Sequence, residues 1–254
     1  MKRYMALHGV KISICYTIAI ACIAFGANAE QNQAPLLEDL LTRLEKQHGN
    51  IKILAARFQQ EKHFSFMDKP VISQGFILFS SPNRIRFDIT EPFQTTLLSD
   101  GKKIERYEFI DSQWRSIQFT GGTSIKLVME QIGQWMRGKF SKQKNLFAMS
   151  VNVDDPNDYA SLDLEPRPKQ FRQYIEKIRI HISKPPKYNI NRIDIYEPEG
   201  DRFALVFVQE ILNQELPKNC FSNPQTAIKC KELFSQGQTE TLKEEKKKKG
   251  NSED

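Results

Sequence analysis

The sequence predicts a mainly β protein whose short strands pair antiparallel and form a sandwich or a barrel. Three features of the 254-residue chain indicate this fold class. From Ile51 onward, apolar and polar side chains alternate as they do in half-buried strands. Turn sequences such as "SSPN" and "SDG" interrupt this alternation about every 8 to 12 residues. Apolar residues at helical spacing are largely confined to residues 36–44 and 125–136.

The first 29 residues have the pattern of a secretory signal peptide. Three cations, Lys2, Arg3 and Lys11, precede an apolar run over residues 12–25, and the run is followed by Ala27-Asn28-Ala29. The run of about 14 residues is shorter than the roughly 20 needed to cross a bilayer. We expect cleavage after Ala29; a lipoprotein-type cut at Cys22 is an alternative with a less complete pattern.

Residues 30–236 are expected to form one domain, in which a helix precedes the strands. In "PLLEDLLTRLEKQ", starting at Pro35, the leucines recur on one face, and Pro suits the first turn of a helix. Strands are then predicted over residues 53–63, 74–80, 84–90, 94–99, 103–110 and 113–118.

A second helix interrupts the strands after Gly121-Gly122. The segment "TSIKLVMEQIGQWMRGKF" has a capping Thr or Ser and one apolar stripe, which comprises Ile125, Val128, Met129, Ile132, Trp135 and Met136. Strands resume over residues 146–153, 159–165, 174–183, 190–196 and 202–212, and a short helix is expected near residues 225–234.

About eleven strands present more apolar surface than two short helices can cover. A barrel of more than about eight strands is too wide for its own side chains to fill. The sheet must therefore either fold onto itself as a sandwich or stay open around a cavity with the helices as a lid. The apolar row Ile77, Phe79, Ile85, Phe87 and Ile89 is either ordinary core or the lining of that cavity.

Two cysteines, Cys220 and Cys230, remain after removal of the signal peptide. An even number in an exported protein predicts a disulfide, and two buried free thiols are the alternative.

The net charge is too small for a nucleic-acid-binding protein. Without the three signal cations, the formal charge of +6 falls to +3. The Lys-rich residues 237–254 are expected to be a disordered tail, with attraction to anionic lipid head groups as the alternative. A concentrated basic stripe that would neutralise phosphates is missing.

The sequence contains no pattern for catalysis, a metal or a cofactor. Its histidines, His8, His48, His63 and His181, have no ligand-like spacing to each other or to cysteine. Nucleophile motifs, phosphate-binding glycine loops and dinucleotide fingerprints do not occur. We therefore expect a protein that is not an enzyme and binds neither metal nor cofactor.

Several short motifs occur together in the order and spacing of a known family. They are "FQQ" at 58–60, Gly75, "SPNRIRF" at 81–87, Pro92, "LLSDGK" at 97–102, Tyr107, "LDLEP" at 162–166, "IEKIRIHI" at 175–182 and "ILNQELPKNCF" at 211–221. In this set the chain resembles the LolA family of periplasmic lipoprotein carriers, over nearly the whole length that follows the signal peptide.

This resemblance implies an incomplete, strongly curved antiparallel barrel with a helical lid that encloses a hydrophobic cavity. Members carry the acyl chains of outer-membrane lipoproteins through the periplasm and have neither enzymatic activity nor a cofactor. Their partners are an inner-membrane ABC-type release complex and, in many bacteria, an outer-membrane receptor. We expect a monomer in the same compartment.

The resemblance also implies which residues bind lipid. Ile85 and Phe87 correspond to cavity-facing positions after the Pro-Asn turn, Ile77 and Phe79 to the preceding strand, and Phe58 to the inward phenylalanine. The remaining lining residues expected are Ile89 of the same row and Met129, Ile132 and Met136 of the second helix. Ser81 stands where well-known carriers have a lid-binding arginine, so the usual latch is absent at the expected lid contact.

Three alternatives belong to other functional classes or cargoes. The same fold could carry another lipid, such as a glycolipid or a polyketide-type product. A periplasmic sensor could use the pocket to detect lipid, although such proteins usually have an additional domain. An acyl hydrolase would need a nucleophile and base, which the sequence does not provide.

Overall fold

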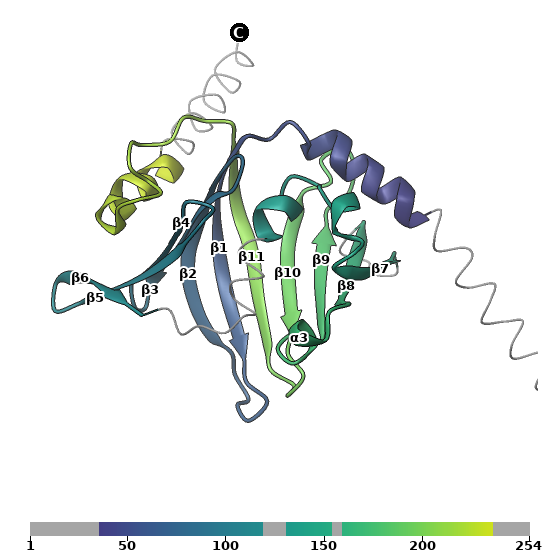
Figure 1. The fold of residues 1–254 in the computed structure, drawn as a ribbon, viewed down its shortest axis with the longest axis horizontal. Coiled ribbons are helices and arrows are strands. Elements are labelled where there is room, and N and C mark those ends of the chain that lie inside the picture. The colour runs from purple at the N-terminus through teal and green to yellow at the C-terminus, as the bar shows by residue number, and fades with distance from the viewer. Residues whose placement is uncertain (1–35, 119–130, 154–158, 236–254) are drawn as a thin grey trace, which may run out of the picture.

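The computed structural model describes residues 36–118, 131–153 and 159–235, and these form one curved sheet with helices on both of its faces (Figure 1). The eleven strands pair antiparallel in the order β6-β5-β4-β3-β2-β1-β11-β10-β9-β8-β7. The sheet is not closed, because β6 and β7 lie at opposite ends of this order. This confirms the predicted mainly β, incomplete-barrel fold class. The predicted signal peptide, residues 1–29, and tail, residues 237–254, lie outside the described residues.

The strand bounds agree with the sequence prediction to within a few residues. The first half contains β1 (Ile53–His63), β2 (Val71–Ser80), β3 (Arg84–Glu91), β4 (Thr95–Ser99), β5 (Ile104–Ile110) and β6 (Gln113–Ile117). The second half contains β7 (Phe147–Asn152), β8 (Ala160–Pro166), β9 (Lys177–Ile182), β10 (Ile190–Tyr196) and β11 (Arg202–Leu212). The two halves are separate meanders, joined where β1 pairs with β11.

The predicted helices are present where the structure describes them. They span residues 36–48, 131–135 and 227–235, the last directly after the 3-10 turn η2 (Pro224–Thr226). Two short elements were not predicted, η1 (Ser141–Gln143) and α3 (Lys169–Arg172). No helix within the described ranges is long and apolar enough to span a bilayer.

The main core lies on the concave face of the sheet. Alternate residues of every long strand point into it; on β9 these are Ile178, Ile180 and Ile182, all buried. Leu40, Leu41 and Leu44 of helix 36–48 join the same cluster. The period-2 pattern in the sequence therefore corresponds to one face packed against helices.

A second, smaller core lies on the convex face beneath the C-terminal segment. Phe76 and Leu78 of β2 contact Leu233 and Phe234 of helix 227–235. Cys220 and Cys230 form a disulfide with their Cα atoms 6.7 Å apart, one of the two predicted alternatives. The segment after β11 thus folds back over β1 and β2.

Arg86 of β3 fixes this C-terminal segment through a buried guanidinium group. The side chain is 0% exposed. It donates hydrogen bonds to Asp88 and to the backbone carbonyls of Cys220 (2.8 Å), Asn223 (2.9 Å) and Pro224 (3.0 Å). Burial raises the pKa of Asp88, although Arg86 and Thr96 act in the opposite direction.

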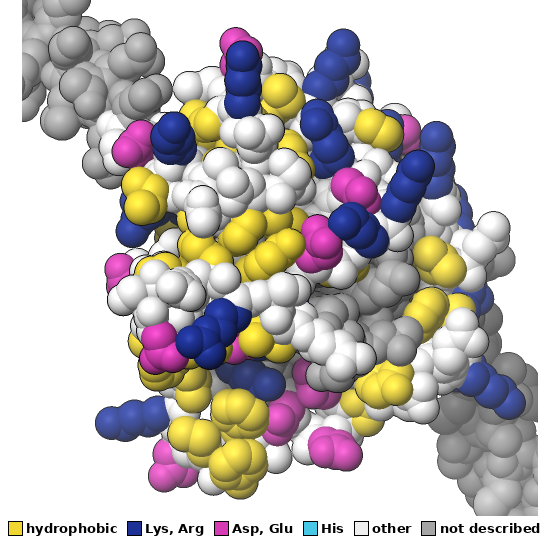
Figure 2. All heavy atoms as spheres, turned by 60° about the vertical axis from the view of Figure 1, so that its left-hand side comes forward, with side chains coloured by type: hydrophobic (Ala, Val, Ile, Leu, Met, Phe, Trp, Pro, Cys, Tyr) yellow, Lys and Arg dark blue, Asp and Glu magenta, His cyan; other side chains and the backbone are white. Residues whose placement is uncertain are grey.

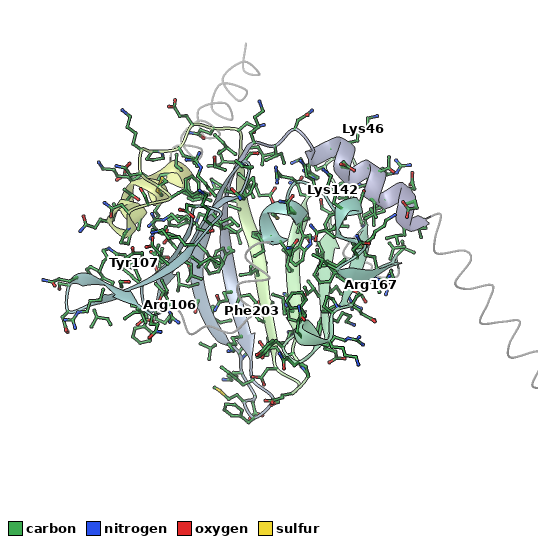
Figure 3. All side chains as sticks on the ribbon, viewed as in Figure 1. Lys46, Arg106, Tyr107, Lys142, Arg167 and Phe203 are labelled. Carbon is green, nitrogen blue, oxygen red and sulfur yellow. A yellow bond between two sulfur atoms is a disulfide. The ribbon has the colours of Figure 1, made fainter. Side chains whose placement is uncertain are left out.

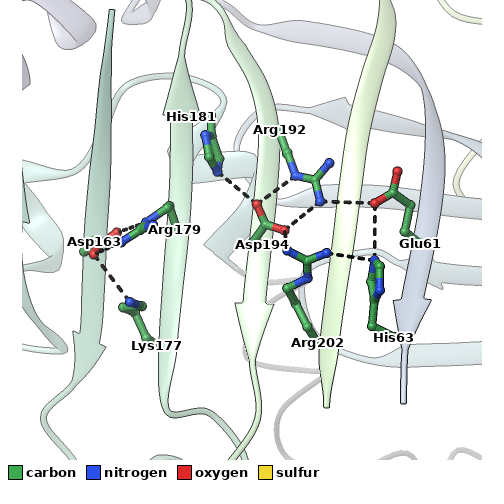
Figure 4. Close-up of polar contacts among 9 residues, drawn as sticks. All are labelled: Glu61, His63, Asp163, Lys177, Arg179, His181, Arg192, Asp194 and Arg202. Atoms are coloured by element: carbon green, nitrogen blue, oxygen red, sulfur yellow. Dashed lines mark hydrogen bonds and ion pairs between the residues drawn. The ribbon is translucent and has the colours of Figure 1, made fainter. Parts of the chain in front are cut away.

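The other half of the convex face carries two groups of ion pairs (Figure 4). Asp163 of β8 pairs with Lys177 and Arg179 of β9 in the smaller group. Asp194 of β10 is the centre of the larger group and is 2% exposed. Arg192 Nε donates to its carboxylate over 2.8 Å, and His181 Nε2 lies 2.9 Å away. Burial raises the pKa of Asp194, but the hydrogen bonds from His181 and Arg192 outweigh this effect and lower it to about 2. The other members of this larger group are Glu61, His63 and Arg202.

Apolar side chains are exposed at one rim of the sheet. Phe66 and Met67 in the β1–β2 hairpin are 80% and 45% exposed, and Phe93 in the β3–β4 turn is 81% exposed. Figure 2 shows hydrophobic side chains gathered at the lower end of the molecule, where this hairpin lies in Figure 1.

We predict that Arg86→Leu lowers the free energy of unfolding by about 3 to 5 kcal/mol, because it leaves Asp88 buried without a cation and removes the donor to three backbone carbonyls. Denaturant unfolding would measure this change. Arg84→Leu is the matched control on the same strand; Arg84 is exposed and bonds Ser80 Oγ, so a change below about 1 kcal/mol is expected. Equal denaturant midpoints for Arg86→Leu and the unmodified protein would contradict the structural role of Arg86.

We predict that Asp194→Asn costs about 2 to 3 kcal/mol at pH 7, because its cationic partners lose a charged acceptor. The pKa of Asp194 is depressed from 3.8 to about 2, so its contribution is complete above pH 3.8 and is lost as the pH falls toward 2. Urea unfolding at several pH values should therefore show the difference from the unmodified protein shrinking below pH 4. A difference that does not change with pH over this interval would show that Asp194 contributes no charge stabilisation.

Candidate functional site

A continuous apolar row crosses the concave face at mid-height. Strand register places Leu97, Phe87, Ile77 and Ala56 directly opposite one another on β4, β3, β2 and β1. A parallel row contains Ile85, Phe79 and Leu54. All seven side chains are buried and belong to the main core cluster.

The predicted lining residues that the structure describes lie together on this face. Phe58, Ile77, Phe79, Ile85, Phe87, Ile132 and Met136 are buried in the main cluster, and Ile89 packs against it partly buried. Met129 lies outside the described residues. The predicted positions are therefore brought together, and their lipid-binding role stays a prediction.

Gly75 explains why two lining phenylalanines on non-adjacent strands can meet. It lies on β2 between Phe58 on β1 and Ile89 on β3. A Cβ at Gly75 would lie 2.8 Å from Phe58 Cζ and 1.9 Å from the Asp88 carbonyl oxygen, so only glycine fits. Across this gap the ring of Phe58 stacks on that of Phe87, with centroids 4.7 Å apart.

Helix 131–135 covers the row at Phe79. A Cβ at Gly133 would lie 2.4 Å from the Phe79 ring, so the helix backbone touches the ring directly. The guanidinium carbon of Arg137 stands 4.5 Å from the ring centroid. Arg137 Nε donates to the Gly133 carbonyl over 3.0 Å, and burial lowers the pKa of the Arg137 guanidinium. Gly133 and Arg137 were not among the predicted site residues, although both lie in the segment predicted to be helical.

The two helices over the concave face also contact each other. Gly138 follows helix 131–135 with a φ of +66°, a conformation that favours glycine, and a Cβ there would lie 2.3 Å from the Leu44 carbonyl oxygen. Trp135 is fully buried and meets Phe147 of β7 edge to face, with ring centroids 6.1 Å apart. Figure 3 shows both helices along one side of the curved sheet, with Lys46 and Lys142 labelled nearby.

Ser81 lies in the turn between β2 and β3. Its N–H donates to the Lys52 carbonyl over 2.8 Å. The nearby Arg86 points to the convex face, where it binds the C-terminal segment. The contact between Ser81 and the lid stays a prediction, because residues 119–130 are not described.

Glu210 places an unexpected carboxyl group on the concave face. It is opposite Ala56 and so extends the central apolar row onto β11. Burial alone raises the pKa of Glu210 to about 7. Within the described residues its side chain has no recorded hydrogen bond or ion pair, and it was not among the predicted site residues.

A separate hollow on the convex side is open and has a mixed polar and apolar lining. Its volume is about 490 Å³, and it lies between the β2–β3 turn and the segment after β11. Charged groups line it, namely Arg84, Asp100, Glu215 and Lys218. This lining suits acyl chains far less than the concave face does.

The described residues offer no centre for metal chemistry. Within these ranges no group of three or more His, Cys, Asp or Glu side chains is placed to hold a metal ion. The concave face is suited to apolar contact, and the titratable pairs on the convex face satisfy one another as ion pairs.

Residues 49–224 match the family model described as outer membrane lipoprotein carrier protein LolA. A comparison with curated proteins finds no match for this chain.

Among solved structures, a DUF1329 family protein from Desulfovibrio piger has a TM-score of 0.43 and 11% identity, covering 74% of this chain and 96% of that chain. A LolA superfamily protein from Nitrosomonas europaea has a TM-score of 0.42 and 12% identity, covering 74% and 98%. The lipoprotein LppX from Mycobacterium tuberculosis has a TM-score of 0.43 and 8% identity, covering 72% and 98%. These likenesses are too distant to assign a function.

The family match spans more than half of the chain and includes every strand of the sheet and the residues of the central apolar row. The protein therefore belongs to the LolA family of outer membrane lipoprotein carrier proteins.

Proposed function

We propose that this protein is a periplasmic carrier that holds the acyl chains of lipoproteins against its concave face and moves them from the inner to the outer membrane. The observation that carries the proposal is the continuous apolar row from Leu97 to Ala56, together with family membership. Its partners would be an inner-membrane ABC-type release complex and an outer-membrane receptor. The carrier would act as a monomer, without catalysis and without a cofactor.

The energetic problem of such a carrier is to shield hydrocarbon from water. At about 0.8 kcal/mol per methylene, a sixteen-carbon chain costs roughly 12 kcal/mol when it is exposed. A face that spans several strands supplies apolar contact along most of such a chain. Strands lie about 4.8 Å apart, so the row from β4 to β1 covers roughly 14 Å.

Uptake and release require that the helices over this face can give up their contacts with the apolar row when an acyl chain binds. The helices contact the row through side chains and glycine backbone, as Gly133 contacts Phe79. Such contacts are non-directional, and an acyl chain can replace them with similar ones. Met136, which has a flexible side chain, also suits guests of different shape.

A carrier of another lipid is the second candidate within the same fold. Ser81, which replaces the arginine expected from the family resemblance, favours this alternative because it implies a different closure of the lid. Depletion of the protein separates the two candidates. Lipoproteins retained in the inner membrane support the first, and normal lipoprotein sorting supports the second. Native mass spectrometry of the protein from its own periplasm would identify the cargo directly.

We predict that Ile85→Glu or Phe87→Glu gives a folded, exported protein whose affinity for a lipopeptide or a hydrophobic dye falls at least about tenfold. The physical reason is that a carboxylate on the apolar row must lose its hydration when the guest binds. Fluorescence titration measures the affinity, and circular dichroism checks the fold.

Arg84→Glu is the matched control, since it places the same charge on β3 but on the exposed opposite face. It should leave dye affinity unchanged. If Ile85→Glu and Phe87→Glu both unfold the protein, these positions serve the core, and the proposal loses its support.

A further inference from the structure

Glu210 faces the concave side because of an irregularity in β11. Opposite the Arg57/Phe58 step, β11 contains an extra residue, Val208, so that Phe207 pairs with Phe58 and Gln209 pairs with Arg57. Gln209 donates to the Phe234 carbonyl on the convex side, and Ile211 packs in the convex core. Glu210, between these two residues, must therefore point to the opposite, concave face.

The surroundings of Glu210 are apolar and small. Ala56 lies directly opposite on β1 and is fully buried, and Ile77 follows in the same row on β2. The Glu210 side chain is partly exposed, so its carboxyl group loses part of its hydration without gaining a protein partner, and this is unfavourable for an unpaired polar group. The fold itself does not use this side chain, since alanine or leucine would fit the pattern of the row.

Several ionisable groups on the helical segments over this face are engaged elsewhere. Arg43 pairs with Asp39, His48 Nε2 lies 2.9 Å from the Tyr188 carbonyl, and Arg137 bonds the Gly133 carbonyl. Within the described ranges the lysines of the loop before β10, Lys184 and Lys187, are exposed. The hydrogen-bonding capacity of Glu210 is thus open to a guest.

We propose that Glu210 forms a polar subsite that binds a hydrogen-bond donor, an amide N–H or a hydroxyl, at the head of the carried lipid. The acyl chain of that lipid then extends from Ala56 over Ile77 toward Phe87. This inference rests on the proposed function, because it assigns the orientation and the class of the guest on the same face. It favours acyl amides and hydroxylated lipids over esters that carry no donor.

The test compares two ligands of equal chain length, palmitamide and methyl palmitate, by displacement of a hydrophobic dye from the full-length protein. Palmitamide has N–H donors, whereas the ester has only acceptors. At about pH 9 the Glu210 carboxyl, with a pKa of about 7, is ionised and can only accept, so one hydrogen bond to it should raise the amide-to-ester affinity ratio about fivefold. Glu210→Leu should lower this ratio about fivefold, with unchanged or tighter binding of the ester. Glu210→Gln, which keeps an acceptor oxygen, should retain a preference for the amide.

Control variants and outcomes keep the two proposals separate. Glu215→Leu removes an exposed carboxylate after β11 and should preserve the amide preference. The same amide-to-ester ratio in Glu210→Leu and the unmodified protein would overturn the subsite but not the carrier function. Failure of the unmodified protein to bind either ligand would instead refute lipid carriage. Tighter binding of hexadecylamine than of palmitamide would show that the subsite takes a cation, which contradicts a neutral donor.

The burial of Glu210 has a pH signature that requires no ligand. Its pKa rises from 4.5 to about 7 on folding, so its effect on stability is favourable below pH 4.5 and is lost as the pH rises through 7. Urea unfolding should show that the free energy of unfolding of the unmodified protein falls between pH 5 and pH 8 relative to that of Glu210→Gln. Parallel pH profiles for the two proteins would show that Glu210 is hydrated in the folded state, which overturns the subsite.

Discussion

The pairing of β1 with β11 is the constraint on which the rest of the structure depends. It joins two meanders that are otherwise independent, and it brings Leu54 beside Leu212 across most of the chain. Both lining rows reach β1 and continue onto β11 through this pair, so each would end at β1 without it. The extra residue at Val208 lies in the same pair and decides which β11 side chains join the lining.

The two faces of the sheet are stabilised by different physical means. The convex face has directional contacts, such as the buried guanidinium of Arg86 and the carboxylate of Asp194, each with several partners. The concave face has non-directional apolar contacts and the stacked rings of Phe58 and Phe87. A fold with this division can lose or exchange contacts on the inner face while the outer face maintains the curvature of the sheet.

Much of the fold could be predicted from the sequence because its strands alternate regularly. The regular period along β2 and β3 correctly assigned Ile77, Phe79, Ile85 and Phe87 to one face and Arg86 to the other. Glu210 could not be predicted in this way. Strict alternation from Phe207 would direct Gln209 inward and Glu210 outward, and the bulge reverses this assignment.

Contacts between residues that are far apart in the sequence could not be predicted either. Nothing near Arg86 in the sequence indicates that its partners are carbonyl groups at residues 220–224. Gly133 and Arg137 were recognised only as helix residues, because their contact with Phe79 depends on how the helix is placed. Local patterns thus determined the elements, and tertiary packing determined the partners.

The C-terminal segment has a practical consequence for protein engineering. Because Arg86 and the convex core fix this segment on the outer face, the described chain ends at Ser235 on the side remote from the lining. A reporter domain fused directly after Ser235 would therefore start outside the concavity. A fusion placed ahead of Leu36 would instead adjoin the helix that covers the inner face, where it could obstruct the entry of a guest (Figure 1).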